Sequence, residues 1–393
     1  MQIRRIGIAG AGLLGRLLAV TLSRAGHRVE VFDPAPNAGP DANSFHGSGV
    51  STGAGAGVRA AGWTAAGMLS PVAELERAGA EVFALGLRSC ALWPDIVQAL
   101  SQPVELHLRG SLLLAHRSDA GAAQRVVGLL QSKAEAAYQP QLLSANELST
   151  LEPSVSGPAL AWLLPCEGQI HPIQAMHALA AQGTLQGVQW HWNATVTAVE
   201  QGVLYVSSST PTVRAESVEA CTDRGQTAVR PAQDKRVVAH GERHAFDHVF
   251  DVRGVGAKPD MPVRGVRGEV FWLHAPGVPL NRPVRLLHPR HSIYMVPRLN
   301  DIIVVGASEI ESEDRSPVSL RSTLELLSAA HSAIPALAEA RVVHSETNLR
   351  PALPDNLPAL HHAPGLTRIN GLFRHGWLIA PALVEQALHE LSL

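Results

Sequence analysis

The chain is poor in cysteine, in aromatic residues and in charge of either sign. Its 393 residues include three cysteines, 4% aromatic and 17% charged residues, with 32 lysines and arginines against 34 aspartates and glutamates. So few cysteines, in an odd number, form no disulfide framework and indicate a reducing compartment. A formal net charge of −2 provides no basic field to hold a polyanion. We therefore expect no nucleic-acid partner.

Long apolar runs are also missing. No apolar segment approaches the roughly 20 residues needed to cross a bilayer, so we predict no membrane span. Arg4 and Arg5 followed by residues 6–14 resemble the start of a secretory signal, but Arg16 interrupts the apolar stretch. We expect a cytoplasmic protein, with a cleaved signal peptide as the alternative.

The sequence contains neither a Cys-x-x-Cys pair nor a Walker-type phosphate loop. His240, His244 and His248 are spaced four residues apart, which on one helix would form a stripe able to bind zinc. Gly241 and the strand-like pattern of residues 246–252 argue against such a helix. We therefore expect no metal site.

The composition and length are those of a globular protein with more than one core. Hydrophobic residues make up 46% of the chain, and 393 residues predict two cores or one nucleotide-binding fold with a large insertion. Residues 3–9 are predicted as a strand, 13–25 as a helix that ends at Gly26, and 29–32 as a second strand. This order predicts a βαβ unit.

The remaining pattern mixes strands and helices and predicts a second sheet with a covering helix. We expect strands at 104–108, 111–115, 189–206, 246–252, 268–274, 292–297, 302–306 and 366–370. We expect helices at 72–93, 120–137, 145–151, 172–182, 320–330 and 379–391. Residues 37–62 and 207–234 have little periodicity and are predicted as surface loops.

A glycine-rich turn joins the first strand to the first helix. Gly10, Gly12 and Gly15 form Gly-x-Gly-x-x-Gly, and Asp33 follows the second strand. This spacing is the dinucleotide fingerprint, in which glycines allow a tight turn and close approach of a pyrophosphate, and the carboxylate binds a ribose hydroxyl. The amides at the helix N-terminus, at Leu13 and Leu14, complete the predicted site. The fingerprint alone does not separate FAD from NAD.

Four further segments separate the two cofactors. These are Ala-Ala-Gly-Met-Leu at 65–69, Tyr-Met-Val-Pro-Arg at 294–298, Leu-Arg-Pro at 349–351 and Asn-Gly-Leu-Phe-Arg-His-Gly-Trp at 370–377. With the fingerprint, they give the chain a resemblance to the FAD-dependent amine oxidases that include D-amino acid oxidase, sarcosine oxidase and, most similar, the glycine oxidases of thiamine biosynthesis. The resemblance covers most of the chain.

The resemblance implies which residues contact the FAD. Besides the fingerprint residues, it assigns the cofactor to Ala66, Gly67, Met68, Val196, Gly254, Arg374, His375, Gly376, Trp377 and Leu378. It also implies an α/β fold with a Rossmann-like FAD-binding domain and an α+β substrate domain with an antiparallel sheet. The expected FAD-binding domain comprises 1–90, 158–262 and 345–393, and the substrate domain 91–157 and 263–344.

Three side chains are expected to bind the substrate. An arginine fork matches a carboxylate bidentately, and the resemblance assigns that role to Arg350. Tyr294, in an apolar strand, needs a partner for its hydroxyl, and the resemblance suggests the same carboxylate. Arg374 receives a supporting role near the site. The alternatives are a salt bridge for Arg350 and a plain core aromatic for Tyr294.

The implied reaction is oxidative deamination of a small amino acid, glycine above all, with oxygen as the electron acceptor. The alternatives are a D-amino acid or N-methyl amino acid dehydrogenase that passes electrons to a quinone or carrier, and a flavoprotein-like binding module without turnover. Because no cysteine follows Cys221, we expect non-covalent FAD. The oligomeric state is left open, with a homo-oligomer as one alternative.

Three residues depart from the pattern of the family. Glu309 stands where the resemblance places an apolar side chain, which implies a more polar pocket. Asp251 and Arg253 replace members of a small-residue run that in the family closes over the FAD pyrophosphate, and the resemblance assigns this contact to Gly254.

Overall fold

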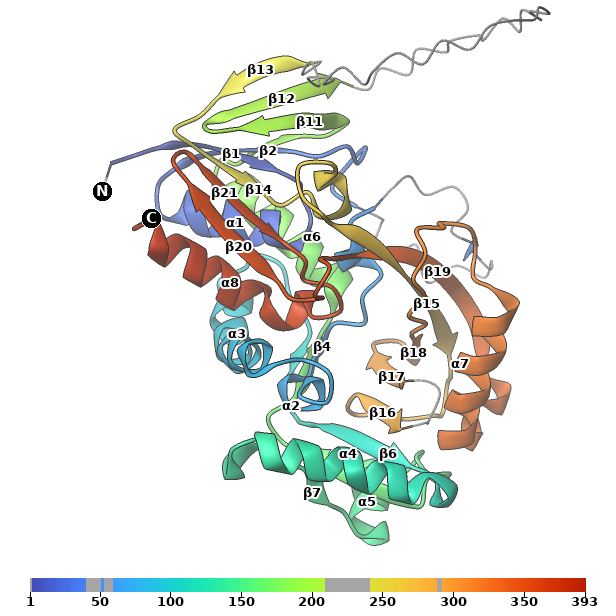
Figure 1. The fold of residues 1–393 in the computed structure, drawn as a ribbon. Coiled ribbons are helices and arrows are strands. Elements are labelled where there is room, and N and C mark those ends of the chain that lie inside the picture. The colour runs from blue at the N-terminus through green and yellow to red at the C-terminus, as the bar shows by residue number, and fades with distance from the viewer. Residues whose placement is uncertain (1, 40–50, 53–58, 209–240, 288–291) are drawn as a thin grey trace, which may run out of the picture.

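The fold is described from a computed structural model, which places residues 2–39, 51–52, 59–208, 241–287 and 292–393. His240, Cys221 and most of the two predicted surface loops, 37–62 and 207–234, lie outside these residues. Two sheets organise the described chain, one above the other in Figure 1. The predicted fold class, a Rossmann-like FAD-binding part with a second α+β part, is confirmed.

The first sheet is parallel except at one edge. It begins with the predicted βαβ unit, β1 (Arg5–Ala9), α1 (Leu13–Arg24) and β2 (Arg28–Phe32). β14 (His248–Asp251) pairs beside β1, and both strands are almost wholly buried, as expected where a parallel sheet is covered on both faces. The strand order is β10-β2-β1-β14-β21-β20, with β10 (Gln189–His191), β21 (Leu366–Asn370) and antiparallel β20 (Ala359–Ala363).

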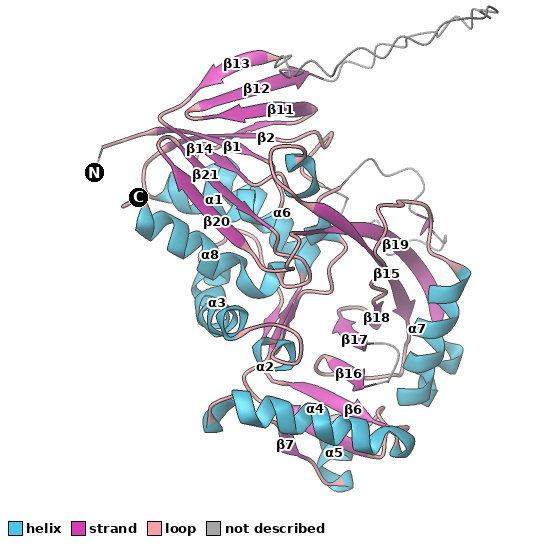
Figure 2. Ribbon diagram, in the orientation of Figure 1, coloured by secondary structure: helices cyan, strands magenta, loops and turns pink. Residues whose placement is uncertain are grey.

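Helices cover one face of this sheet and a small β-meander covers the other (Figures 1 and 2). The helices are α1, α6 (Pro172–Leu185), α8 (Gly376–Glu390) and α3 (Ala80–Gln98), which contact one another. The meander is β11 (Ala194–Glu200), β12 (Val203–Ser208) and β13 (Glu242–Ala245). Phe32, Leu204 and Phe246 belong to the apolar cluster between the meander and the sheet.

The second sheet is mixed and has nine strands in the order β3-β19-β15-β18-β17-β16-β6-β8-β7. Its centre is β15 (Arg264–His274) paired antiparallel with β19 (Arg341–Ala352). The others are β18 (Ile302–Gly306), β17 (Ser292–Arg298), β16 (Val284–Leu287), β6 (Ser111–Ala115), β8 (Leu160–Leu164), β7 (Gln141–Leu142) and β3 (Ser51–Thr52).

Helices complete this second part. α7 (Leu320–Ala333) packs on β16, β17 and β18, α4 (Ala120–Lys133) covers the β6 side, and α5 (Ala145–Leu151) precedes β8. A small sheet of β4 (Met68–Leu69), β9 (Gly168–Ile170) and β5 (Leu106–His107) lies in the connection, next to α2 (Pro71–Glu74). No helix of the described residues could span a membrane.

The predicted helix over 72–93 is wrong in one respect, because it is divided into α2 and α3. Lys133 Nζ of α4 donates a hydrogen bond to the Leu75 carbonyl at 2.7 Å, and a continuous helix would need that carbonyl for its own ladder. Gly79 is the N-cap of α3.

The predicted domain boundaries assign β8 and most of β19 to the FAD-binding domain, yet both strands pair in the nine-stranded sheet. The boundaries themselves stay a prediction.

Gly15 gives a test of the βαβ turn. A Cβ at Gly15 would overlap the Gly10 carbonyl oxygen, which is backbone and cannot move aside. We predict that Gly15→Ala costs about 4 kcal/mol or more of unfolding free energy, measured by urea denaturation. Gly128 is the matched control, because it lies in α4 with no atom within 4 Å of a built Cβ. Gly128→Ala should gain about 0.5–1 kcal/mol; equal stability of both variants would contradict the packing role.

Candidate active site

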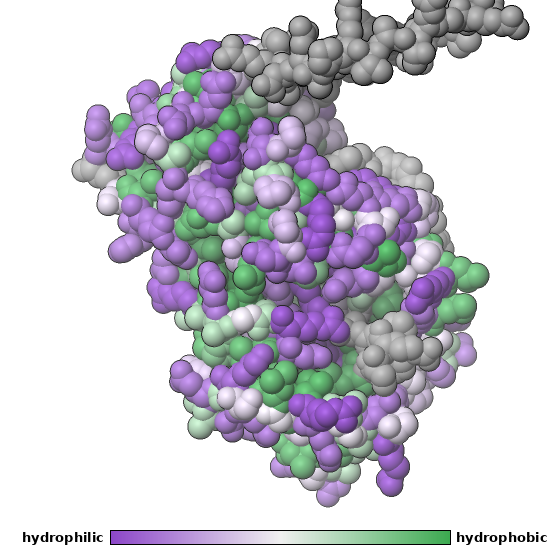
Figure 3. Space-filling model, viewed as in Figure 1, coloured by the Kyte–Doolittle hydropathy of each residue, from purple (hydrophilic) through white to green (hydrophobic). Residues whose placement is uncertain are grey.

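A cavity of about 980 Å³ lies between the two sheets and takes its wall from both. On the face shown in Figure 3, hydrophilic side chains cross the middle of the molecule, where the sheets meet. The lining includes the first glycine turn, residues 64–68, residues 252–256, Tyr294, Arg350 and the turn at 372–378. Most residues singled out in the sequence therefore meet in one place.

The glycine turn forms one end of the cavity. Gly10 has φ +107, and a Cβ there would lie 2.8 Å from the Val252 carbonyl oxygen. The first amides of α1 have no intrahelical hydrogen-bond partner, as at the start of any helix. Gly12 is the N-cap and has no side chain that could accept a hydrogen bond from them. Leu13 and Leu14 line the cavity. A bare helix N-terminus of this kind is an anion site that fits a pyrophosphate.

Asp33 lies where the dinucleotide fingerprint requires a carboxylate. Its Oδ2 accepts a hydrogen bond from the Ala11 amide at 2.6 Å, and its Oδ1 accepts one from the Ala35 amide at 2.9 Å. These bonds fix the carboxylate at the cavity wall beside Gly10 and Gly12. Each carboxylate oxygen has more than one lone pair, so Asp33 can still accept a hydroxyl hydrogen bond.

Two predicted contacts are not found in the cavity wall. Gly15 does not line the cavity and instead packs α1 against the Gly10 carbonyl. Val196 lies in the meander, and its carbonyl accepts a hydrogen bond from Arg253 Nη1 at 3.3 Å. Arg253 lines the cavity in that region, and its guanidinium also binds Asp251 Oδ2 at 2.8 Å and Asp260 Oδ2 at 2.6 Å.

The predicted flavin-facing segments line the cavity, and hydrogen bonds from neighbouring residues support them. Ala66, Gly67, Met68 and Gly254 belong to the lining, as do Arg374, His375, Gly376, Trp377 and Leu378. Arg298 donates a hydrogen bond to the Ala66 carbonyl and another to Gln169 Oε1 at 3.2 Å. Trp377 Nε1 donates to the Gly62 carbonyl at 3.1 Å, and the Trp377 ring stacks on Trp93. These contacts within the protein support the cavity wall.

Arg350 is a guanidinium in the cavity wall without a carboxylate beside it among the described residues. Its Nη1 donates to the Ser308 carbonyl at 3.0 Å and to the Arg267 carbonyl at 3.4 Å. Gly268 makes room for it, since a Cβ there would lie 2.6 Å from the guanidinium. Burial lowers the pKa of Arg350. The salt-bridge alternative for this residue is therefore not met in the described chain.

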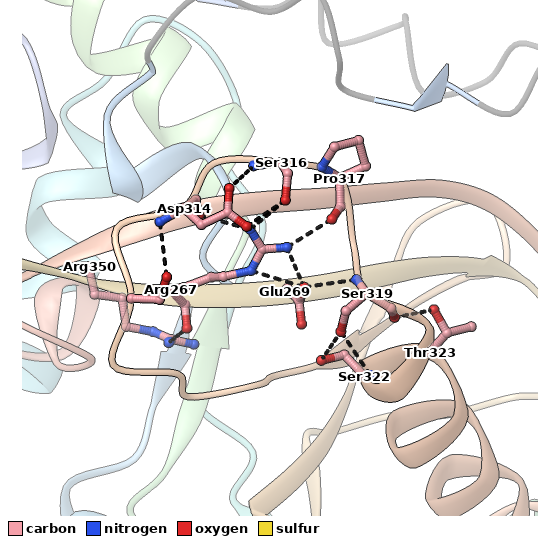
Figure 4. A network of polar contacts seen from close by, with 10 residues as sticks. Arg267, Glu269, Asp314, Ser316, Pro317, Ser319, Ser322, Thr323 and Arg350 are labelled. Carbon is pink, nitrogen blue, oxygen red and sulfur yellow. Dashed lines mark hydrogen bonds and ion pairs between the residues drawn. The ribbon is translucent and has the colours of Figure 1, made fainter.

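Arg267, on the neighbouring strand, shows the contrast (Figure 4). Its Nη2 lies 2.6 Å from Glu269 Oε1, and both side chains are almost fully buried. Arg267 also binds Asp314 Oδ2 at 3.1 Å and the Pro317 carbonyl at 2.8 Å. Its charge is neutralised within the protein, whereas that of Arg350 is left for a ligand.

Tyr294 lies on β17 and lines the same cavity as Arg350. A Cβ at position 306 would lie 2.6 Å from the Tyr294 hydroxyl oxygen, so the glycine at this position leaves room for the Tyr294 ring. Burial raises the pKa of the Tyr294 phenol, although the charges of nearby arginines, Arg350 first, oppose the rise. The hydroxyl keeps its proton at neutral pH and can donate a hydrogen bond to an anion.

Arg374 belongs to a cluster of charges that the sequence did not reveal. Its Nη2 lies 3.4 Å from Glu74 Oε1, and its Nη1 lies 3.2 Å from Glu309 Oε2. Glu74 also faces Arg285 Nη2 at 3.0 Å and His375 Nδ1 at 3.4 Å. Burial alone would raise the pKa of Glu74, but Arg374 and Arg285 hold that pKa at about 2. Arg374 is therefore a paired cation, unlike Arg350.

The histidines considered for zinc do not meet on a helix. His244 lies on β13 and His248 on β14, while His240 is outside the described residues. Within the ranges that the structure describes, no group of three histidine, cysteine or acidic side chains is arranged to hold a metal.

The comparisons with known proteins agree with this geometry. A family profile described as FAD dependent oxidoreductase matches residues 5–387. A Rhizobium etli protein, whose name assigns it to thiamine biosynthesis as the oxidoreductase ThiO, is 32% identical over 98% of this chain and 96% of its own length. The glycine oxidase of Geobacillus kaustophilus is 25% identical over 96% of this chain and 89% of its own length.

Two solved structures share the fold. The crystal structure of that glycine oxidase has a TM-score of 0.74 at 23% identity, covering 98% of this chain and 93% of its own. An iminodiacetate oxidase from Chelativorans sp. BNC1 also has a TM-score of 0.74, at 21% identity, covering 99% and 95%. The glycine turn, Asp33 and the cavity wall fit FAD. The chain belongs to the family of FAD-dependent oxidoreductases, and FAD is its cofactor.

Proposed function

We propose that the protein oxidises glycine or another small amino acid, and that the resulting imine is hydrolysed by water to the 2-oxo acid and ammonia. The observation that carries the proposal is Arg350, a half-buried guanidinium in the cavity wall that has no ion pair with a carboxylate among the described residues. The names of the relatives, a glycine oxidase and the oxidoreductase ThiO, support the same reaction and a place in forming the thiazole of thiamine.

Arg350 and Tyr294 divide the work of holding the substrate. Arg350 binds the substrate carboxylate through its fork, and the Tyr294 hydroxyl donates to the same group. Bound FAD would supply the hydride acceptor for this oxidation. Arg350 and Tyr294 would fix the carboxylate and so orient the α-carbon, from which the neutral amine substrate can lose a hydride without a strong protein base. Glu74 and Glu309, two carboxylates in the wall, form ion pairs with Arg374.

The electron acceptor in this proposal is molecular oxygen. Glycine, oxygen and water then yield glyoxylate, ammonia and hydrogen peroxide. A cytoplasmic location and the oligomeric state stay predictions from the sequence.

The cofactor attachment can be tested directly. We expect the protein to purify yellow with non-covalent FAD, because the glycine turn, Asp33 and the segments at 65–68 and 372–378 line one cavity. Acid precipitation should leave the flavin in the supernatant. Colour that remains with the pellet would contradict the non-covalent attachment.

The substrate is tested by anaerobic reduction. Glycine, sarcosine, D-alanine and D-phenylalanine are added in turn, the bleaching of flavin absorbance is followed, and air is then readmitted. We expect glycine to give the highest kcat/KM, sarcosine and D-alanine to be slower, and D-phenylalanine to be nearly inert. One methylene is worth only about 1–3 kcal/mol in such a pocket. A preference for D-phenylalanine would replace glycine oxidation with a broader D-amino acid oxidase activity. Reduction that air does not reverse would indicate a different electron acceptor.

Arg350 and Arg267 form a matched pair for mutation. Arg350→Met should weaken substrate binding by about 2–5 kcal/mol while leaving stability nearly unchanged, because no buried carboxylate loses its partner. Arg267→Met should instead cost about 3–5 kcal/mol of unfolding free energy, because the buried carboxylate of Glu269 would lose its ion pair and keep only neutral donors such as the Ser319 amide. Thermal melting and the KM for glycine separate the two effects. An unchanged KM in Arg350→Met would remove Arg350 from the site.

A further inference from the structure

Three of the arginines in the cavity wall, Arg350, Arg285 and Arg374, differ in their access to a ligand. Arg350 has only carbonyl partners in the described chain. Arg285 is paired with Glu74 at 3.0 Å, and Arg374 is paired with Glu74 at 3.4 Å and with Glu309 at 3.2 Å. All three act electrostatically on Tyr294, so they surround one region of the cavity. Only one of the three is free to receive an anion.

Glu309 occupies a particular place in this arrangement. It follows Ser308, whose carbonyl accepts the hydrogen bond from Arg350, so one short segment after β18 holds the free arginine and carries the carboxylate that covers Arg374. Its side chain is 43% exposed, and Arg77 Nη1 lies 3.9 Å from its Oε2. Glu309 therefore stands in the cavity wall as a negative charge that solvent and an incoming ligand can reach.

We propose that Glu309 is a specificity-determining residue that restricts the site to amines carrying a single carboxylate. The inference rests on the proposed function, because it takes Arg350 as the receptor of that carboxylate. Glu309 acts in two ways: it occupies the guanidinium of Arg374, and it places a negative charge where a second substrate carboxylate would have to enter.

The electrostatic reasoning concerns the second group on the substrate amine. An uncharged substituent such as the methyl group of sarcosine meets no charge penalty beside Glu309. A carboxymethyl group, as in iminodiacetate, needs a second cation, and Arg374 already faces two carboxylates. Like charges brought together at a binding site oppose binding strongly. Discrimination against dicarboxylates thus comes from repulsion, and discrimination in favour of monocarboxylates comes from Arg350.

The first experiment compares turnover of the FAD-loaded protein with glycine, sarcosine and iminodiacetate. Glu309→Gln removes the charge and keeps the shape. We expect the ratio of kcat/KM for iminodiacetate to that for glycine to rise about tenfold or more, with the sarcosine to glycine ratio changing by less than about twofold. An unchanged iminodiacetate ratio would overturn the proposal.

Glu76 provides the matched control. It lines the same cavity, and its charge also acts on Arg374, but no ion pair joins these two side chains in the described part of the chain. Glu76→Gln removes the same charge without freeing Arg374. We expect it to change the iminodiacetate ratio by less than about twofold. If the iminodiacetate to glycine ratio rose equally in both variants, the effect would come from the net charge of the cavity and not from the ion pair between Glu309 and Arg374. That result would overturn the proposal.

The second experiment measures binding without turnover. Acetate and malonate are titrated into the FAD-loaded protein, and the perturbation of flavin absorbance gives each Kd. In Glu309→Gln we expect the Kd for malonate to fall about tenfold and that for acetate to stay within about twofold. A parallel change for both ligands would contradict a role specific to the second carboxylate.

The two proposals fail in different ways. If glycine does not reduce the flavin and acetate does not perturb it in the unmodified protein, the proposed function fails. If glycine and acetate bind as expected but iminodiacetate is oxidised as efficiently as glycine, the proposed function stands and the role of Glu309 is wrong.

Discussion

A half-buried positive charge that forms no ion pair within the described chain is the constraint around which the site is built. Taking the guanidinium of Arg350 out of water is costly unless its hydrogen bonds are replaced. The protein supplies the carbonyls of Ser308 and Arg267 and leaves out a side chain at Gly268 to make room. The long pairing of β15 with β19 sets these groups in register. The charge itself stays available, and this keeps the cavity receptive to an anion.

Several cations near Arg350 are instead paired with carboxylates. Glu74 is shared among Arg285, Arg374 and His375, which come from β16 and from the turn before α8. A single carboxylate at the end of α2 thus joins the second sheet to the helical layer of the first. Arg267 forms an ion pair with Glu269 of the same strand. An arginine with a carboxylate beside it forms an ion pair within the protein, and an arginine without one can bind an anionic ligand.

The features predicted correctly from the sequence are those that depend on residue spacing within short segments. The glycine turn, Asp33, β6, α5, β18 and β21 follow from spacing within short segments, and the resemblance placed Arg350 and Tyr294 at one cavity. Glu74 could not be found in this way, because its partners are more than 200 residues away along the chain. Val196 does not belong to the cavity lining, and its carbonyl accepts a hydrogen bond from Arg253, so its contact with FAD stays a prediction. Long-range ion pairs leave no periodic signal in a single sequence.

The contact between Trp377 and Gly62 has a consequence for how the cofactor and the fold depend on each other. These residues are 315 positions apart, and their hydrogen bond closes one side of the cavity wall. Two segments so far apart along the chain meet only when the chain between them has lost conformational entropy. The complete cavity therefore exists only in the assembled protein. By mass action, FAD that binds this cavity stabilises the assembled fold, in which both parts of the wall are present.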